Sequence, residues 1–216
     1  MEKKVYLEEA VEERSNGASG RKTVLLIGDS IRLGYCRTVR DELSDVADVV
    51  YPEENCRFSQ YILVNLSAWA GLCDPDKVAL VQFNCGHWDA AHWGGEEEPL
   101  NALPVYQDNV RRIIRRLRLL FPCARVVFAT TTPMNPDGSM GKNPRTTEEI
   151  CRYNEAAVRA AREEGATVDD LFAFARDLAP SCYQDYCHYT PEYFALLGRQ
   201  VASFLREALR EQEAPH

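Results

Sequence analysis

Residues 23–30, Thr-Val-Leu-Leu-Ile-Gly-Asp-Ser, decide the fold of this 216-residue chain. Its first five residues are apolar or β-branched, which is typical of a short strand buried in the middle of a parallel sheet. Gly28 ends that strand, and Asp29 and Ser30 are favoured residues at the start of a helix. The amphipathic residues that follow predict this helix (Ile31, Leu33, Val39 and Leu43). A serine on such a turn is exposed at the carboxyl edge of the sheet, beside N–H groups that can stabilise an anion, so Ser30 is either a nucleophile or a helix cap.

The rest of the chain alternates between apolar strands and amphipathic helices. Further strands are predicted at residues 48–51, 77–83, 125–131 and 166–169, and further helices at 58–70, 105–121, 147–164, 171–178 and 191–210. Alternation of this kind predicts a parallel sheet with helices on both faces. Five strands joined by short crossovers favour a flavodoxin-like, three-layer α/β/α fold with strand order 2-1-3-4-5, in which ligands bind at the carboxyl ends of the strands.

Length and composition predict one domain and limit its partners. Apolar residues make up 45% of the chain, which is enough for a full core over residues 22–212. Residues 1–21 are charged and end in a Gly/Ser-rich stretch, which predicts a flexible leader without the apolar core of a secretory signal. The net charge of −8 argues against a nucleic-acid partner. Because no run of about 18 apolar residues exists, no membrane insertion is expected.

The eight cysteines are scattered along the chain and form no C-x-x-C pair. In a chain of this length without an export signal, this pattern predicts free thiols and a cytoplasmic location. Structural zinc sites use closely spaced cysteines and histidines, so no metal site is expected.

A serine nucleophile needs a base, and the base needs an acid that orients it. His188 stands shortly before the final predicted helix, and Asp185 lies three residues earlier on an irregular segment. This carboxylate can fold back to the Nδ1–H of the imidazole, which leaves Nε2 to take the serine proton. D-x-x-H alone is a weak pattern, and the alternative is that both residues only cap the helix. Its place beyond the fifth strand, with Ser30 after the first, favours catalysis. Cys187 is better explained as a structural cysteine than as a thiol nucleophile.

The conjunction of Gly28-Asp29-Ser30-Ile31 with Asp185-x-x-His188 resembles the SGNH hydrolase family, the GDSL-type esterases and lipases. The first stretch is similar to the family block that carries the nucleophile, and the second to the block that supplies acid and base. The resemblance extends over about residues 22–210. It implies a flavodoxin-like fold that cleaves small-molecule esters through an acyl-enzyme, without a metal or organic cofactor.

Two other family blocks are altered in this sequence. In the second block, Cys56 stands about where the family has a glycine whose N–H binds the oxyanion, and a cysteine N–H can donate equally well. In the third block, Trp88 stands where an asparagine is expected. Two replacements are open: the amide of Asn84 at the end of the third strand, which we favour, or the indole N–H of Trp88. The predicted oxyanion donors are therefore the N–H groups of Ser30 and Cys56 together with Asn84.

A long loop at residues 84–104 follows the third strand, and loops of this length in a compact domain are usually functional. Asp29, Arg57, His87 and Trp88 are the predicted substrate-binding residues, since aromatic faces suit sugars or acyl chains and arginine suits an anionic group. The leading hypothesis is a serine esterase acting on a small polar ester such as an O-acetylated sugar. The alternatives are a lysophospholipase or thioesterase with the same triad, and a binding module that has lost activity. The apolar final helix and the Trp-rich loop leave room for a homodimer.

Overall fold

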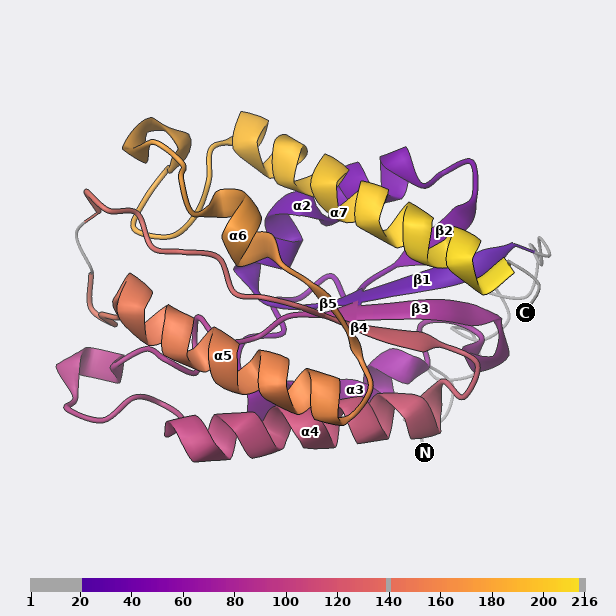
Figure 1. Cartoon of the computed structure of the whole chain (residues 1–216), viewed down its shortest axis with the longest axis horizontal. Coiled ribbons are helices and arrows are strands. Elements are labelled where there is room, and N and C mark those ends of the chain that lie inside the picture. Colours follow the sequence, from indigo (N-terminus) through magenta and orange to yellow (C-terminus); the bar gives the residue numbers. More distant parts are fainter. Residues whose placement is uncertain (1–20, 139–140, 214–216) are drawn as a thin grey trace, which may run out of the picture.

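The computed structural model describes residues 21–138 and 141–213 (Figure 1), so the predicted leader at residues 1–21 lies outside the described residues apart from Arg21. Five parallel strands form one sheet in the order β2-β1-β3-β4-β5. The strands are β1 (Lys22–Ile27), β2 (Ala47–Val50), β3 (Val78–Phe83), β4 (Arg125–Ala129) and β5 (Thr167–Asp169). The predicted fold class and strand order are confirmed.

Helices cover both faces of the sheet. One face carries α2 (Ser30–Glu42), α6 (Leu171–Ala175) and α7 (Pro191–Glu213), and the other carries α3 (Ser59–Ala70), α4 (Leu103–Leu120) and α5 (Thr147–Glu163) (Figure 1). Single turns of 3-10 helix lie at Pro75–Lys77, Trp93–Gly95 and Pro180–Cys182. The helix predicted at 171–178 ends early, at Ala175, and is followed by a turn in which the N–H of Leu178 donates to the carbonyl of Ala175.

β1 lies inside the sheet, paired with β2 on one side and β3 on the other. The chain leaves its carboxyl end towards β2, while β3 and the later strands extend the sheet in the opposite direction, so β1 and β3 flank the topological switch point. Ile27 is aligned with Phe83, and the N–H of Asn84 donates to the carbonyl of Ile27 at 3.0 Å. Gly28 and Asn84 therefore leave the sheet side by side. A Cβ atom at Gly28 would lie 1.8 Å from Oδ1 of Asn84, so this turn accepts only glycine.

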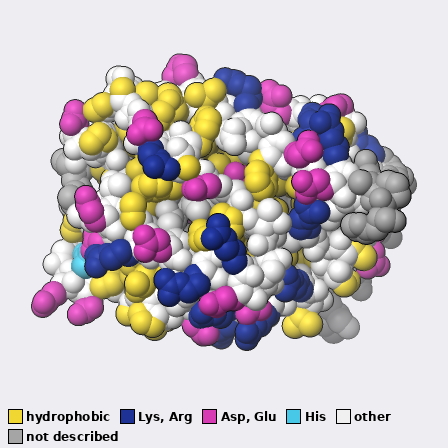
Figure 2. Space-filling view, viewed as in Figure 1, with side chains coloured by type: hydrophobic (Ala, Val, Ile, Leu, Met, Phe, Trp, Pro, Cys, Tyr) yellow, Lys and Arg dark blue, Asp and Glu magenta, His cyan; other side chains and the backbone are white. Residues whose placement is uncertain are grey.

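The arginine-rich face of α4 forms ion pairs within the domain. Two of its arginines form ion pairs with the end of α5, Arg111 with Glu163 at 2.7 Å and Arg115 with Glu164 at 2.6 Å. On the face shown in Figure 2, acidic and basic side chains are interspersed. These pairs support the interpretation of the arginine run as a solvated helix face. Among the described residues, no helix is both long and apolar enough to cross a membrane.

Candidate active site

Ser30 is the first residue of α2, and the cap of this helix is its neighbour. Oδ1 of Asp29 accepts the N–H of Ile31 at 3.0 Å, which leaves the Ser30 hydroxyl free of a capping role. That hydroxyl instead hydrogen-bonds to Nε2 of His188 at 2.7 Å. Of the two roles that the sequence left open for Ser30, the structure excludes the helix cap. It also corrects the prediction that Asp29 binds substrate, because this side chain is fully buried inside the turn.

His188 connects Ser30 to Asp185. Oδ2 of Asp185 lies 2.7 Å from Nδ1 of His188, and Oδ1 accepts the N–H groups of Cys187 at 2.9 Å and His188 at 2.8 Å. The Asp185 carboxylate thus accepts hydrogen bonds within its own turn. It does not cap α7, whose first N–H groups donate to the carbonyl of Thr190. Partial burial raises the pKa of Asp185, but the hydrogen bonds from the two N–H groups and the imidazole outweigh it and hold the pKa below its ordinary value.

An ionised carboxylate can only accept hydrogen bonds, so Nδ1 of His188 carries the proton in this pair. The lone pair of Nε2 then faces the hydroxyl of Ser30, and the imidazole can take the hydroxyl proton as the oxygen attacks. Cys187 offers no competing nucleophile. Burial raises the pKa of its thiol to about 12, although the charge of Arg145 acts in the opposite direction.

Asp185, Cys187 and His188 also form a group whose potential ligand atoms lie within 4.8 Å of one another in the described part of the chain. The carboxylate and the imidazole are paired with each other, and the raised pKa keeps the thiol protonated. Since metal ions bind thiolate and unpaired ligands, this donor set suits proton transfer better than metal binding.

A cleft of about 280 Å³ opens at Ser30 and His188. Its other lining residues come from four segments of the chain: Asn55, Trp88, Ala91, Trp93, Asn143, Arg145 and Tyr186. The rings of Trp88 and Trp93 pack together at a centroid distance of 5.0 Å and form one aromatic wall. Part of the long loop after β3 therefore contributes directly to the cleft.

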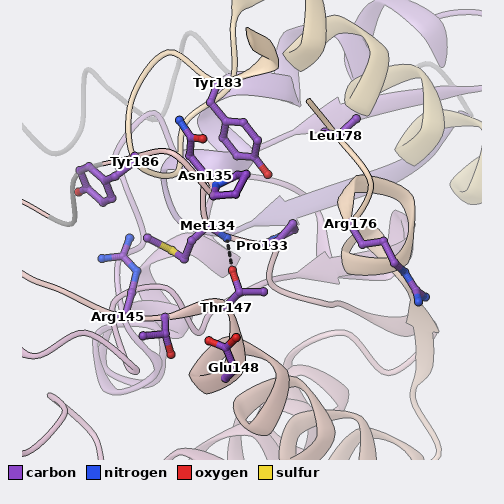
Figure 3. A pocket seen from close by; sticks show the side chains of 13 residues that line it. Pro133, Met134, Asn135, Arg145, Thr147, Glu148, Arg176, Leu178, Tyr183 and Tyr186 are labelled. Carbon is purple, nitrogen blue, oxygen red and sulfur yellow. Dashed lines mark hydrogen bonds between the residues drawn. The ribbon is translucent and has the colours of Figure 1, made fainter. Parts of the chain in front are cut away.

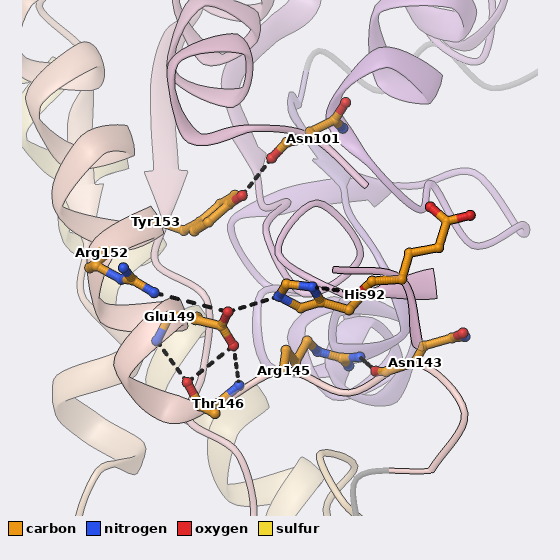
Figure 4. Close-up of polar contacts among 9 residues, drawn as sticks. His92, Asn101, Asn143, Arg145, Thr146, Glu149, Arg152 and Tyr153 are labelled. Carbon is orange, nitrogen blue, oxygen red and sulfur yellow. Dashed lines mark hydrogen bonds and ion pairs between the residues drawn. The ribbon is translucent and has the colours of Figure 1, made fainter. Parts of the chain in front are cut away.

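Contacts between this loop and the segment before α5 hold two walls of the cleft together (Figure 4). The N–H of His92 donates to the carbonyl of Pro144 at 2.9 Å, and the N–H of Gly94 donates to Oδ1 of Asn143 at 3.1 Å. Nε2 of His92 pairs with Oε1 of Glu149 at 2.9 Å, and this hydrogen bond raises the pKa of His92. His92 therefore connects the two walls, but it does not line the cleft.

Two of the predicted oxyanion donors are already engaged inside the protein. The N–H of Cys56 donates to the carbonyl of Gly28 at 3.0 Å. Nδ2 of Asn84 donates to Oδ1 of Asp29 at 2.9 Å, and the side chain is buried. Neither residue lines the cleft. The single N–H of Cys56 is used in this way, which corrects the prediction for that residue, whereas Asn84 uses one of its two amide hydrogens to close the turn that presents Ser30.

Asn55 is a cleft residue that the sequence interpretation missed. Its Oδ1 accepts the N–H of Arg57 at 2.8 Å, so the amide nitrogen is the part of Asn55 left for a ligand. Arg57 has a left-handed φ of 53°, and an asparagine two residues before such a position is a signal for this side-chain turn. The fully buried Arg32 anchors the loop by donating to the carbonyls of Pro52 at 2.8 Å and Glu54 at 2.6 Å.

Trp88 is the one predicted substrate-binding residue that lines the cleft. Arg57 is exposed, and its guanidinium lies over the ring of Tyr61 at 4.7 Å. His87 is buried: its Nδ1 accepts the Nε–H of Arg145 at 3.3 Å. The burial of His87 corrects the prediction that it contacts substrate. The guanidinium of Arg57 also lies 6.0 Å from the ring of Trp88, which lines the cleft, so its role in substrate binding stays a prediction. Arg145, which no motif marked, lies in the cleft in their place.

Comparisons with known proteins find relatives of this chain and solved structures with a similar fold. Residues 26–195 match the model of the GDSL-like Lipase/Acylhydrolase family. The chain is 28% identical over 211 residues to the GDSL esterase/lipase WDL1 of Oryza sativa subsp. japonica, covering 88% of this chain and 80% of that protein. It is similar to the lipase/acylhydrolase from Enterococcus faecalis, with a TM-score of 0.69 and 16% identity over 86% of this chain and 96% of that one. Est24, a carbohydrate acetylesterase from Sinorhizobium meliloti, gives a TM-score of 0.67 and 13% identity, with 87% of this chain and 99% of that one covered.

Proposed function

The chain belongs to the GDSL-like lipase/acylhydrolase family, which consists of carboxylic ester hydrolases, and we propose that it is a serine esterase using Ser30, His188 and Asp185 as its triad. The observation that carries this proposal is the unbroken hydrogen-bonded chain from Oγ of Ser30 to Nε2 of His188, and from its Nδ1 to Oδ2 of Asp185, with both contacts at 2.7 Å. The same contacts disfavour a binding module that has lost its activity, because nothing in binding alone requires a histidine held in one tautomer by a carboxylate.

The reaction follows from these contacts. Oγ of Ser30 attacks the acyl carbon while Nε2 of His188 takes the hydroxyl proton, and the imidazolium is stabilised by Asp185. The bond from the acyl carbon to the leaving oxygen then breaks, and Nε2 protonates the departing alcohol. In the second half, water attacks the acyl-enzyme and gives a proton to Nε2. The bond to Oγ breaks, Oγ regains the proton, and the carboxylic acid leaves.

The oxyanion needs donors that can reach the cleft. We assign this role to the N–H of Ser30, which as the first residue of α2 has no intrahelical partner, and to the amide nitrogen of Asn55. Asn55→Asp tests the assignment because an aspartate keeps an oxygen for the N–H of Arg57 while it removes the donor. We expect kcat to fall about 10²- to 10³-fold with little change in KM. A loss below about tenfold would contradict this assignment. Trp88→Phe removes the indole N–H that is the alternative donor, and the variant with the larger loss in kcat identifies which of the two residues serves.

The cleft favours a small polar ester such as an O-acetylated sugar. Its volume of about 280 Å³ fits a short acyl group, Trp88 and Trp93 offer flat faces for a sugar ring, and Asn143 and Arg145 add polar groups. The structural similarity to a carbohydrate acetylesterase supports the same class. A lysophospholipase or long-chain thioesterase is the second candidate and requires room for an extended apolar chain.

A fluorophosphonate probe and p-nitrophenyl acetate test the nucleophile directly, with Ser30→Ala as the matched variant. We expect the wild type to be labelled and to turn over the ester, and the variant to do neither. A wild type that behaves like the variant would overturn the esterase proposal. Acyl-chain lengths from acetyl to palmitoyl, tested beside acetylated sugars, then separate the two substrate classes, since activity that rises with chain length would favour the second candidate.

Two further expectations extend the proposal. All eight cysteines lie in the described residues and are free thiols, which supports a reducing compartment such as the cytoplasm. A homodimer remains a prediction from the sequence. Cell fractionation and analytical ultracentrifugation test these two expectations.

A further inference from the structure

Arg145 is a buried cation in the wall of the cleft that holds Ser30 and His188. Its side chain is 5% exposed. Its hydrogen bonds go to three polar partners: Nε to Nδ1 of His87 at 3.3 Å, Nη1 to the carbonyl of Asn143 at 3.2 Å, and Nη2 to Sγ of Cys187 at 3.4 Å. Within residues 21–138 and 141–213, no carboxylate forms an ion pair with Arg145, whereas ion pairs occupy arginines on the protein surface.

The partners of Arg145 are held neutral. Burial, together with the charge of Arg145, lowers the pKa of His87 well below its ordinary value. Nδ1 of His87 accepts from Arg145, so its proton is on Nε2 and is donated to Oγ1 of Thr132 at 3.2 Å. The nearby acid Asp29 accepts its hydrogen bonds from the N–H of Ile31 at the start of α2 and from the amide of Asn84. The side chains that hydrogen-bond to Arg145 are therefore uncharged, and Asp29 interacts with its charge without an ion pair between them.

An uncompensated buried charge is costly to maintain, and proteins usually pair it with an opposite charge or expose it. The guanidinium of Arg145 is buried, but it lines the cleft and can therefore contact a ligand there. The planar, forked donors of arginine match the two oxygens of a carboxylate, and the low dielectric of a closed cleft strengthens that contact. An anionic ligand in the cleft would supply the missing counter-charge.

We propose that Arg145 binds a carboxylate of the substrate, so that the enzyme acts on esters that carry a negative charge close to the ester bond. This inference rests on the proposed esterase function and narrows its substrate class. An O-acetylated sugar acid combines the required features, since its ring can lie on the tryptophan wall while its carboxylate reaches Arg145.

A second cavity gives the rest of such a substrate room. It has a volume of about 420 Å³, and Figure 3 shows Arg145 and Tyr186 at its edge. Both residues line the two cavities, and the guanidinium lies 5.2 Å from the centre of the Tyr186 ring. Arg145 and Tyr186 therefore border both cavities, and a substrate whose carboxylate binds Arg145 can extend towards either of them.

Matched ester pairs test the inference and show which side of the ester carries the charge. For the alcohol side we would compare 4-acetoxybenzoate with neutral 4-acetoxybenzamide, and for the acyl side 4-nitrophenyl hydrogen adipate with 4-nitrophenyl hexanoate. The readout is the ratio of kcat/KM for the anionic member over the neutral one, because a general loss of activity cancels in this ratio. We expect the wild type to prefer the anionic member of at least one pair by about tenfold to a hundredfold, as for a hydrogen bond to a charged group.

Three variants make the test decisive. Arg145→Gln should bring the ratio close to that of a neutral site, and Arg145→Lys should retain part of the preference because it keeps the charge and loses the fork. Arg115→Gln removes a surface arginine and the same net charge, and should leave the ratio unchanged. A wild type without preference in either pair, or a preference that survives Arg145→Gln, would overturn the inference.

A binding measurement keeps this result separate from the esterase proposal. Calorimetric titration of 4-acetoxybenzoate into Ser30→Ala reports anion binding without hydrolysis, and the double variant with Arg145→Gln is its control. If binding depends on Arg145 while the wild type hydrolyses no ester, the anion site stands and the esterase proposal fails. If p-nitrophenyl acetate is hydrolysed but neither the ester ratio nor the binding responds to Arg145, the anion site alone is overturned.

Discussion

Asp185→Asn is the change that most directly tests whether the hydrogen bonds from Ser30 through His188 to Asp185 serve catalysis. The variant is isosteric and can keep Oδ1 as the acceptor for the N–H groups of Cys187 and His188, so the turn should be retained. The other branch becomes an NH₂ group, which lies 2.7 Å from Nδ1 of His188 in place of a carboxylate oxygen. Since this group can only donate, Nδ1 must become the acceptor and the imidazole proton moves to Nε2.

The expected loss follows from that tautomer. With Nε2 protonated, His188 donates a hydrogen bond to Oγ of Ser30 and can no longer take the serine proton. We expect kcat to fall about 10⁴-fold, which corresponds to about 5 kcal/mol of transition-state stabilisation at about 1.4 kcal/mol for each factor of ten. The fold should be nearly unaffected, because the side chain of Asp185 is 43% exposed and its two backbone contacts persist.

The assay is turnover of p-nitrophenyl acetate at pH 8, together with thermal unfolding of the variant and the ¹⁵N shifts of the His188 ring. We expect a large loss in kcat, a melting temperature close to that of the wild type, and ring shifts that report the proton on Nε2. A loss smaller than about tenfold in a folded variant with the altered tautomer would refute the reasoning, because Ser30 would then not need His188 as its base.

Two predictions concern stability and pH. Burial raises the pKa of Asp169 to about 7, above its unfolded value. The contribution of this group to the free energy of unfolding is therefore complete at low pH and is lost as the pH rises from about 4 through about 7. Asp169→Asn should therefore match the wild type near pH 4 and be more stable at pH 8, by up to ~4 kcal/mol for a shift of about three pKa units, and urea unfolding at both pH values checks this. The hydrogen bond to Glu149 raises the pKa of His92, so this contact stabilises fully below the unfolded pKa of about 6.5 and weakens as the pH rises through the folded value. His92→Ala should therefore lose more stability relative to the wild type at pH 6 than at pH 9, and an equal loss at both values would show that the contact does not depend on the charge of His92.

The fold was predictable because each strand leaves a strong local signal. Residues 23–27 and 78–83 are nearly continuous apolar runs, which only a sheet covered on both faces buries completely. The boundaries shifted by one or two residues at most elements, as expected where chain ends fray. The clearest miss was the helix predicted at 171–178, where the apolar pattern continues because Leu178 still packs against the core after the helix has ended at Ala175.

The placement of the proposed triad residues was predictable for a different reason. Ser30, Asp185 and His188 stand at positions that topology brings to one edge of the sheet, where they form one hydrogen-bonded chain. Arg145 left no such signal. It stands in an irregular segment before a capping box, and its place in the cleft depends on tertiary contacts with His87 and Cys187.

The oxyanion donors show where reasoning from strand ends fails. Asn84 was placed correctly at the carboxyl end of β3, but the direction of its amide was decided by the nearest buried acceptor, Oδ1 of Asp29. Burial raises the pKa of Asp29, and the hydrogen bond from Asn84 is the largest influence that lowers it again. A buried carboxyl group without donors costs more than an unfilled site for a substrate oxygen, since water can fill the site until substrate arrives. Asn84 is therefore used to hold the cap of α2, and the position of Ser30 depends on it. We therefore assign the side-chain donor to Asn55, whose amide oxygen holds its own loop and leaves the nitrogen for the substrate oxygen.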